Sequence, residues 1–128
     1  MSGRPARRSA GPAARRLRRA PTPELLGMVA ARFRALAEPA RLAVLHALED
    51  GPRSVTALVA RTGLSQANLS KHLQQLHASG FVSRTRRGAF VDYALADDRV
   101  LQLCELMCGR LEEDLAQARE TLAERRTA

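Results

Sequence analysis

The sequence predicts a mainly α-helical fold with one small β-hairpin, in the order helix, helix, helix, helix, strand, strand, helix. Apolar residues recur at helical spacing in four segments between residues 22 and 80. From residue 81 the pattern changes to β-branched and aromatic residues on both sides of a turn that contains glycine. A long helical repeat of apolar residues then fills the end of the chain. A helix-turn-helix that is followed by such a hairpin is the arrangement of a winged helix-turn-helix.

The first helix is predicted to begin at Thr22, whose hydroxyl caps a helix with proline at its first position and Glu24 in its first turn. It ends before Pro39, because proline disfavours helical geometry at the residue that precedes it. A second helix follows, and the stretch Glu-Asp-Gly-Pro at 49–52 ends it. The apolar residues at helical spacing are Leu25, Val29, Phe33 and Leu36 in the first helix and Leu42, Leu45 and Leu48 in the second.

Two serines mark the starts of the third and fourth helices. Ser54 caps a short third helix, and Ser65 caps a fourth helix that ends at residues 79–80. The tight turn between them contains Gly63, so the pair has the pattern of a helix-turn-helix. The buried stripe of the fourth helix is expected to consist of Leu69, Leu73 and Leu76.

The rest of the chain predicts a hairpin and a long last helix. The strands are residues 81–85 and 90–95, joined by the turn Arg-Arg-Gly-Ala at 86–89. The last helix opens at residues 96–98 and continues to about residue 124. Its apolar residues alternate spacings of four and three, which is typical of a helix packed along another helix, and we expect a dimer. These seam residues are Cys104, Cys108, Leu111, Leu115, Ala118 and Leu122.

Positive charge is concentrated at the start of the chain. The sequence has 21 lysine and arginine residues against 13 acidic ones, and seven of the arginines lie in residues 1–20, which contain no acid. Residues 1–21 have almost no large apolar side chain, so we expect a disordered tail there. We expect residues 22–124 to form one winged helix-turn-helix domain for DNA binding and dimerisation. A basic arm favours a polyanionic partner, nucleic acid first. The tail either adds phosphate contacts or only aids solubility.

The exposed face of the fourth helix predicts contact with DNA. Residues 62–80 contain no acid, whereas a solvated helix face usually mixes glutamate with lysine. Amides can pair with base edges, and hydroxyls and lysine can bind bases or phosphates. His72, beside the core stripe, either packs structurally or touches DNA. The candidate DNA-binding residues are Ser65, Gln66, Ala67, Asn68, Ser70, Lys71 and Gln74 on the helix and Arg84, Arg86 and Arg87 on the hairpin.

Four stretches and one tyrosine carry a family resemblance. They are Phe-Arg-Ala-Leu-Ala-Glu-Pro-Ala-Arg-Leu at 33–42, Leu-Ser-Gln-Ala-Asn-Leu-Ser-Lys-His-Leu at 64–73, Gly-Phe-Val at 80–82, Arg-Arg-Gly at 86–88, and Tyr93. With them the chain resembles the ArsR/SmtB family of bacterial repressors over about residues 24–120. The resemblance implies a homodimer built from the first and last helices, and operator binding that an inducer relieves. It also implies that Gln66, Ala67, Ser70 and Lys71 approach bases.

Inducers of this family are often metals or thiol-reactive compounds, but two of its ligand patterns are missing here. Residues 57–60 of the third helix offer no ligand, and the last helix has no histidine. Cys104 and Cys108 remain, and their spacing strains an intrachain disulfide, because their Cβ atoms stand about 5–6 Å apart rather than about 3.8 Å. Two thiolates cannot complete a tetrahedral site. One interpretation is therefore a soft metal ion that the cysteines of both subunits hold together across the dimer. Thiol-based redox or sulfur sensing and purely structural cysteines are the others.

Together these patterns predict a sequence-specific DNA-binding transcriptional repressor of the ArsR/SmtB type, whose partners are double-stranded operator DNA and a second copy of the chain. Release by a metal or a thiol-reactive inducer is part of this expectation. The alternative is a winged-helix protein-interaction module with only non-specific DNA affinity. No apolar run is long enough for a membrane span, and no Gly-rich phosphate loop or nucleophile with a His–acid arrangement is visible. We therefore expect a cytoplasmic protein that is not an enzyme.

Overall fold

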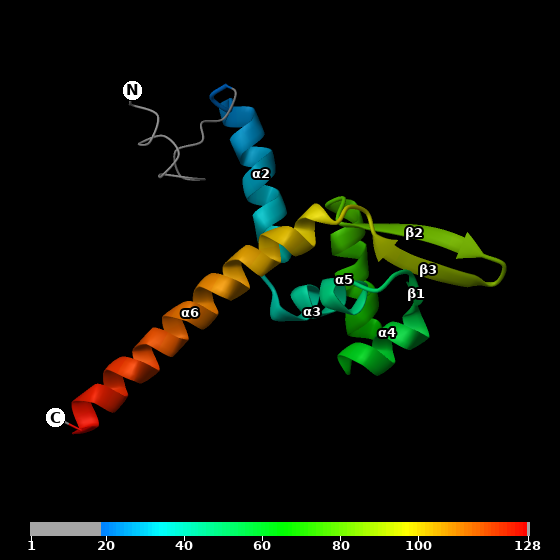
Figure 1. Ribbon diagram of the computed structural model, residues 1–128. Coiled ribbons are helices and arrows are strands. Elements are labelled where there is room, and N and C mark those ends of the chain that lie inside the picture. The colour runs from blue at the N-terminus through cyan, green and yellow to red at the C-terminus, as the bar shows by residue number, and fades with distance from the viewer. Residues whose placement is uncertain (1–18, 128) are drawn as a thin grey trace, which may run out of the picture. The chain divides into compact units, whose positions relative to one another are not determined.

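The computed structural model describes residues 19–127, so most of the predicted tail at 1–21 lies outside the described residues. The chain divides after Ala31 into two compact units. The first unit holds most of α2 (Pro23–Leu36), and the second begins with the end of this helix and holds all the other elements (Figure 1). The Oγ1 atom of Thr22 accepts a hydrogen bond from the Leu25 amide at 3.1 Å, which confirms the predicted start of α2.

Three further helices form the centre of the second unit: α3 (Pro39–Ala47), α4 (Val55–Thr62) and α5 (Gln66–Ala78). The predicted caps are both present, because Ser54 Oγ accepts from the Ala57 amide and Ser65 Oγ accepts from the Asn68 amide, each at 3.2 Å. Gly63 has a φ of 74° and ends α4 in the left-handed conformation that glycine adopts without strain. The turn that it makes allows α5 to start only a few residues after α4 ends.

The sheet has three strands rather than the predicted two. The short strand β1 (Arg53–Ser54) pairs with β3 (Phe90–Leu95), and β3 pairs with β2 (Val82–Arg87), so the order is β1-β3-β2. The hairpin turn is also tighter than the predicted turn at 86–89, because Arg87 pairs with Phe90 and only two residues connect the strands. Gly88 supplies the positive φ, 63°, that a two-residue turn needs at its first position.

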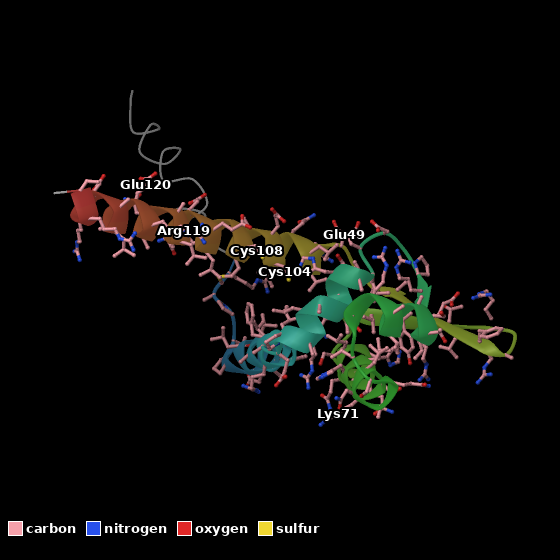
Figure 2. All side chains as sticks on the ribbon, turned by 90° about the horizontal axis from the view of Figure 1, so that it is seen from below. Glu49, Lys71, Cys104, Cys108, Arg119 and Glu120 are labelled. Carbon is pink, nitrogen blue, oxygen red and sulfur yellow. The ribbon has the colours of Figure 1, made fainter. Side chains whose placement is uncertain are left out.

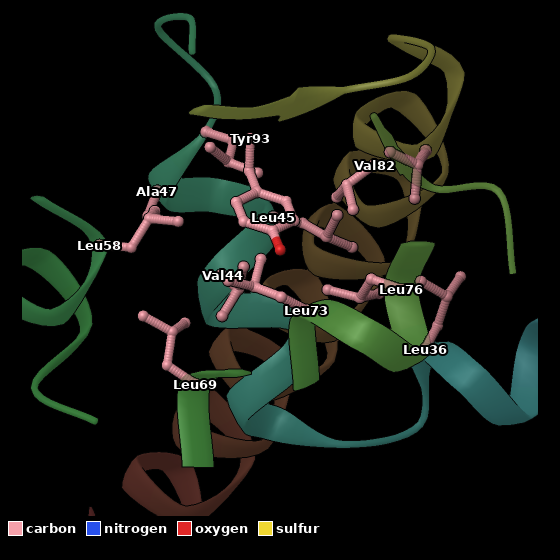
Figure 3. Close-up of a cluster of buried hydrophobic side chains, with 12 residues drawn as sticks. Leu36, Val44, Leu45, Ala47, Leu58, Leu69, Leu73, Leu76, Val82 and Tyr93 are labelled. Atoms are coloured by element: carbon pink, nitrogen blue, oxygen red, sulfur yellow. The ribbon is translucent and has the colours of Figure 1, made fainter. Parts of the chain in front are cut away.

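The core of the second unit lies between α3, α4, α5 and the sheet (Figure 3). Leu69, Leu73 and Leu76 are fully buried, which confirms the stripe predicted for α5. Leu45 of α3 and Leu48, which directly follows this helix, are buried as well, whereas Leu42 is only partly buried. Tyr93 reaches this core from β3 (Figure 3). Burial of about 1.5–3 kcal/mol per large aliphatic side chain fixes the orientation of α5, so its opposite face must point outward.

The last helix, α6 (Arg99–Thr127), starts as expected but continues three residues beyond the predicted end at about 124. The Asp97 carboxylate accepts a hydrogen bond from the Arg99 amide at 2.8 Å and thereby caps the helix. Residues 125–127 contain no glycine or proline that would stop it, and the Thr127 hydroxyl donates back to the Glu124 carbonyl at 3.0 Å. Only Val100 of this helix is buried in the single chain.

Candidate nucleic-acid interface

The outward face of α5 carries the side chains that the sequence singled out for DNA. Gln66, Ala67, Asn68, Lys71 and Gln74 are exposed, and no acidic residue lies anywhere in the helix. Lys71 extends from the surface of α5 (Figure 2). Ser70 is half-buried. The structure therefore leaves the five exposed side chains available for an external partner.

Ser65 differs from the other candidate residues of this face because it caps the helix. Its Oγ atom is used as the cap of α5, where it accepts the Asn68 amide. The free amides of the first turn and the absence of acid there give this helix end a partial positive charge, which attracts phosphate groups. Ser65 thus shapes the helix end, while its hydroxyl proton stays free to be donated.

The three candidate arginines of the hairpin are not equivalent. Arg84 pairs with Tyr93 and Arg86 with Val91, so both lie on the sheet face that carries the buried Tyr93. Their side chains line an open pocket together with Val55 at the start of α4. Arg87 lies on the opposite face of the hairpin.

Arg87 is held by a carboxylate of the next strand. Its Nε and Nη2 atoms donate to the two carboxylate oxygens of Asp92 at 2.8 and 3.1 Å, and its guanidinium lies 5.9 Å from the Phe90 ring centroid. The hydrogen bonds from Arg87 lower the pKa of Asp92, and the same bonds raise the pKa of Arg87. Arg84 and Arg86 have no such ion pair among residues 19–127. They are therefore the free cations of the β2–β3 hairpin, which is the wing of the fold.

One functional contact was missed from the sequence: a hydrogen bond that holds α5 from behind. Arg41 Nε donates to His72 Nδ1 at 3.2 Å, and its Nη1 atom donates to the Ala35 carbonyl at 3.2 Å. Of the two interpretations left open for His72, the geometry supports the structural one. Nothing in the local spacing indicates this pair, because the two residues are 31 positions apart.

The two cysteines lie on α6, well away from Lys71 on α5 (Figure 2). Both are free thiols, Cys104 half-buried and Cys108 exposed, so neither is a buried core residue of the single chain. Burial raises the pKa of the Cys104 thiol, and the neighbouring Cys108 charge raises it further. Within residues 19–127 no three histidine, cysteine or acidic side chains gather as a metal site.

Large apolar side chains are exposed on two helices. On α2 they include Leu25, Leu26, Met28 and Val29. On α6 they include Leu106 and Met107, which are 74% and 62% exposed, and the predicted seam residues Leu111, Leu115 and Leu122. Clusters of exposed large apolar side chains are characteristic of surfaces that pair with another chain.

The comparisons with known proteins agree with this geometry. Residues 38–84, which include α3, α4, α5 and the first part of β2, match the model of the arsR family of bacterial regulatory proteins. The chain is 35% identical to the homodimeric winged helix-turn-helix DNA-binding domain of a possible ArsR-family regulator from Mycobacterium bovis, with a TM-score of 0.65, and covers 85% of that chain. The protein belongs to the ArsR family. Its winged helix-turn-helix fold and its family were thus both predicted correctly from the sequence.

Two relatives illustrate the range of the ArsR family. The chain is 40% identical over 74 residues to a probable mercury resistance operon repressor from Streptomyces lividans, and 34% identical over 94 residues to the nodulation protein NolR from Rhizobium meliloti. These matches cover 58% and 73% of this chain, and 59% and 77% of the relatives. The chain therefore spans less than two thirds of the Streptomyces repressor. Among residues 19–127, no helix has the length and apolar character that crossing a bilayer requires.

Proposed function

We propose that this ArsR-family protein is a sequence-specific transcriptional repressor that binds operator DNA as a homodimer. The observation that carries the proposal is the outward face of α5, which has exposed amides and one lysine, contains no acid and is fixed from behind by three buried leucines. A helix of this kind fits the major groove, where amides and lysine distinguish base pairs.

The wing supplies the contacts that fix the orientation of the protein on the duplex. Arg84 and Arg86 are exposed on one face of the hairpin and are free to bind phosphate or minor-groove acceptors, whereas Arg87 is neutralised by Asp92. Phosphate contacts set the register and carry no sequence information themselves. Sequence choice therefore falls to α5, with Gln66, Asn68, Lys71 and Gln74 as the groups that reach base edges.

A second copy of the chain supplies a second α5, so that the dimer presents two helices that read DNA. The exposed apolar residues of α2 and those of α6 are each a surface that such a copy would cover. The NolR and Mycobacterium relatives support the family assignment. Two reading helices related by a two-fold axis require a near-palindromic operator, with half-sites about 10 base pairs or a multiple apart. The protein would act by occupying promoter DNA in the cytoplasm, and not by catalysis.

Selection of bound duplexes from a random library tests this proposal. The expected product is a near-palindromic site with half-sites about one helical turn, or a multiple of one, apart. A population without sequence preference would contradict the proposal and would favour a protein-interaction module with non-specific DNA affinity. A matched selection with Lys71→Ala should lose the preference at specific positions, while Arg110→Ala, on an exposed part of α6, should not.

A further inference from the structure

Most of α6 is exposed in the single chain. Its first turn is attached to the core of the second unit through the buried Val100, and Leu101 packs against the same core. Residues 110–127 are exposed apart from the half-buried Thr121, and they extend beyond α3, α4, α5 and the sheet (Figure 1). Because most helical stability comes from the packing of an apolar face, we expect another chain to cover this part of α6.

The apolar residues of this part fit an antiparallel copy of themselves. They are Leu111, Leu115, Ala118 and Leu122, and their alternating spacings of four and three form a coiled-coil seam. If a second α6 runs in the opposite direction across a two-fold axis, Leu111 lies opposite Leu122 of the partner subunit. In the same alignment Leu115 lies opposite Ala118 of the partner subunit. A large side chain thus meets a small one on both sides of the axis, and leucine meets leucine further out.

A line of four charged residues borders this seam. They recur every seven positions, which places them on one side of the seam, and in chain order they are Glu105, Glu112, Arg119 and Arg126. All four are exposed, and none forms an ion pair with another residue in the range 19–127. Nearby, Arg110 and Asp114 of the same helix pair with each other at 3.1 Å. The four border charges are therefore free for another chain.

The alignment that pairs the leucines also pairs these charges. Because the order glutamate, glutamate, arginine, arginine is reversed in an antiparallel copy, Glu112 lies opposite Arg119 of the partner subunit. Glu105 lies opposite Arg126 of the partner subunit in the same way. Sliding one copy by seven residues brings Glu112 opposite Glu112 of the partner subunit. Sliding it the other way brings Arg119 opposite Arg119 of the partner subunit. Each shift places like charges together, so the charges and the apolar residues favour the same register.

A parallel pair would use these charges less well. In a parallel coiled coil each border residue faces the other border of the seam, where this helix carries Met107, Asp114 and Thr121. Only Asp114 could offer a charge there, and Arg110 already binds it. The antiparallel orientation is therefore the one that satisfies all four border charges.

We propose that the charge order along α6 determines which chain this protein pairs with: a second copy of itself, antiparallel over residues 105–126 and in one register. This inference deepens the homodimer of the proposed function and rests on it. Opposite charges beside a seam set the choice of partner and its orientation, and a chain with another charge order at these positions brings like charges together. The selection matters because a mixed dimer would present one foreign α5 to a palindromic operator.

Sedimentation equilibrium of the full-length protein at low ionic strength, without DNA, tests the pairing. Across a two-fold axis each reversal changes two contacts, so Glu112→Arg and Arg119→Glu should each raise the dimer Kd by roughly 10- to 100-fold. The double variant Glu112→Arg/Arg119→Glu restores opposite charges and should return the Kd to within about threefold of the wild type. Glu113→Arg is the matched control, because it reverses the neighbouring charge on the outer side of the helix, and it should leave the Kd unchanged.

Mixing the two single variants gives a second test that a loss of folding cannot imitate. In a dimer of one Glu112→Arg chain and one Arg119→Glu chain, the two new charges face each other and so do the two native ones. Native mass spectrometry of an equimolar mixture should therefore find mainly the mixed dimer. In sedimentation experiments, high salt should reduce the differences among the variants, because it screens exposed charges.

The outcomes distinguish this pairing from the proposed function. Single variants that dimerise as tightly as the wild type, a double variant that does not recover, or a statistical mixture of dimers would each overturn the pairing of α6 and leave the repressor dimer standing. A wild type that stays monomeric at all concentrations would instead contradict the homodimer itself, and the pairing with it.

Discussion

Arg41 and His72 join the end of α2 to the reading helix. The Nε atom of Arg41 donates to Nδ1 of His72 at 3.2 Å, while its Nη1 atom donates to the Ala35 carbonyl, also at 3.2 Å. One guanidinium thus satisfies a carbonyl near the end of α2 and holds the inner side of α5. His72 must keep Nδ1 unprotonated to accept this bond, which places its ring proton on Nε2.

Replacing Arg41 by alanine should destabilise the fold. Hydrogen bonds that involve a charged group contribute about 1.5–3 kcal/mol, and Arg41 makes two of them in a half-buried position. We expect Arg41→Ala to lower the free energy of unfolding by about 1.5–3 kcal/mol in urea titrations. Arg41→Lys should recover only part of the loss, since lysine lacks the planar fork. Arg110→Ala is the control, because it removes only an exposed ion pair and should change the free energy of unfolding little. An effect of Arg41→Ala as small as that of the control would contradict this account.

The wing arginines should separate into two classes in DNA titrations. Arg84→Ala and Arg86→Ala each remove a free cation and should weaken binding to all sequences, lowering the slope of log affinity against log salt by about one. Arg87→Ala should have a smaller effect on both quantities, because Asp92 already neutralises Arg87. Fluorescence anisotropy at several salt concentrations measures this. Three equal slopes would show that the Arg87–Asp92 pair opens on DNA.

The carboxyl of Asp97 should titrate far below its normal range. Hydrogen bonds from the Arg99 side chain and, to a smaller extent, from the Arg99 backbone amide lower its pKa to about 2. Because the folded pKa is depressed, the contribution of Asp97 to stability is present above the unfolded pKa, near 3.8, and is lost as the pH falls toward 2.

NMR titration of the Asp97 carboxyl carbon measures this shift directly. We expect a midpoint near 2 in the wild type and a higher midpoint in Arg99→Ala, still below the ordinary 3.8 because the backbone amide of residue 99 continues to donate to the carboxylate. A normal midpoint for Asp97 in the wild type would show that the cap of α6 is open in solution.

The apolar face of α6 should be required for the second copy of the chain. Leu111 and Leu115 are 52% and 57% exposed in the single chain and lie one turn apart. Introducing a charge at either position, as Leu111→Glu or Leu115→Glu, should convert a dimer to a monomer in analytical ultracentrifugation, since burying an unpaired charge is costly. Gln117→Glu, on the other side of the helix, should leave the dimer intact. A dimer that tolerates both leucine changes would place the interface elsewhere.

Local sequence patterns were sufficient for most of the fold, because helix caps and apolar spacing act over a few residues. The caps at Ser54 and Ser65 and the buried stripe of α5 are local features of this kind. The strand β1 was not predicted because two residues are too short to show an alternating pattern. The extent of β2 was misjudged because Gly88 permits a two-residue turn, so that Arg86 and Arg87 join the strand.

The outward face of α5 could be predicted from the sequence, but the contacts of the hairpin arginines and of His72 could not. The exposed amides and Lys71 on α5 follow directly from the position of the leucine stripe, since the opposite face of a helix must point outward. The different states of the three wing arginines depend on which strand neighbour lies diagonally opposite, and therefore on the register of the hairpin. The Arg41–His72 bond depends on how α3 packs against α5, which no local pattern reports.

Binding of the selected operator by wild-type and Lys71→Ala protein, measured by fluorescence anisotropy at fixed salt, tests the central claim most directly. If α5 reads base pairs, Lys71→Ala and Gln66→Ala should each cost roughly 1–3 kcal/mol on the operator and much less on a scrambled duplex of the same length. Arg110→Ala should match the wild type on both duplexes. Unchanged operator affinity in both α5 variants would contradict the assignment of this helix as the one that reads DNA.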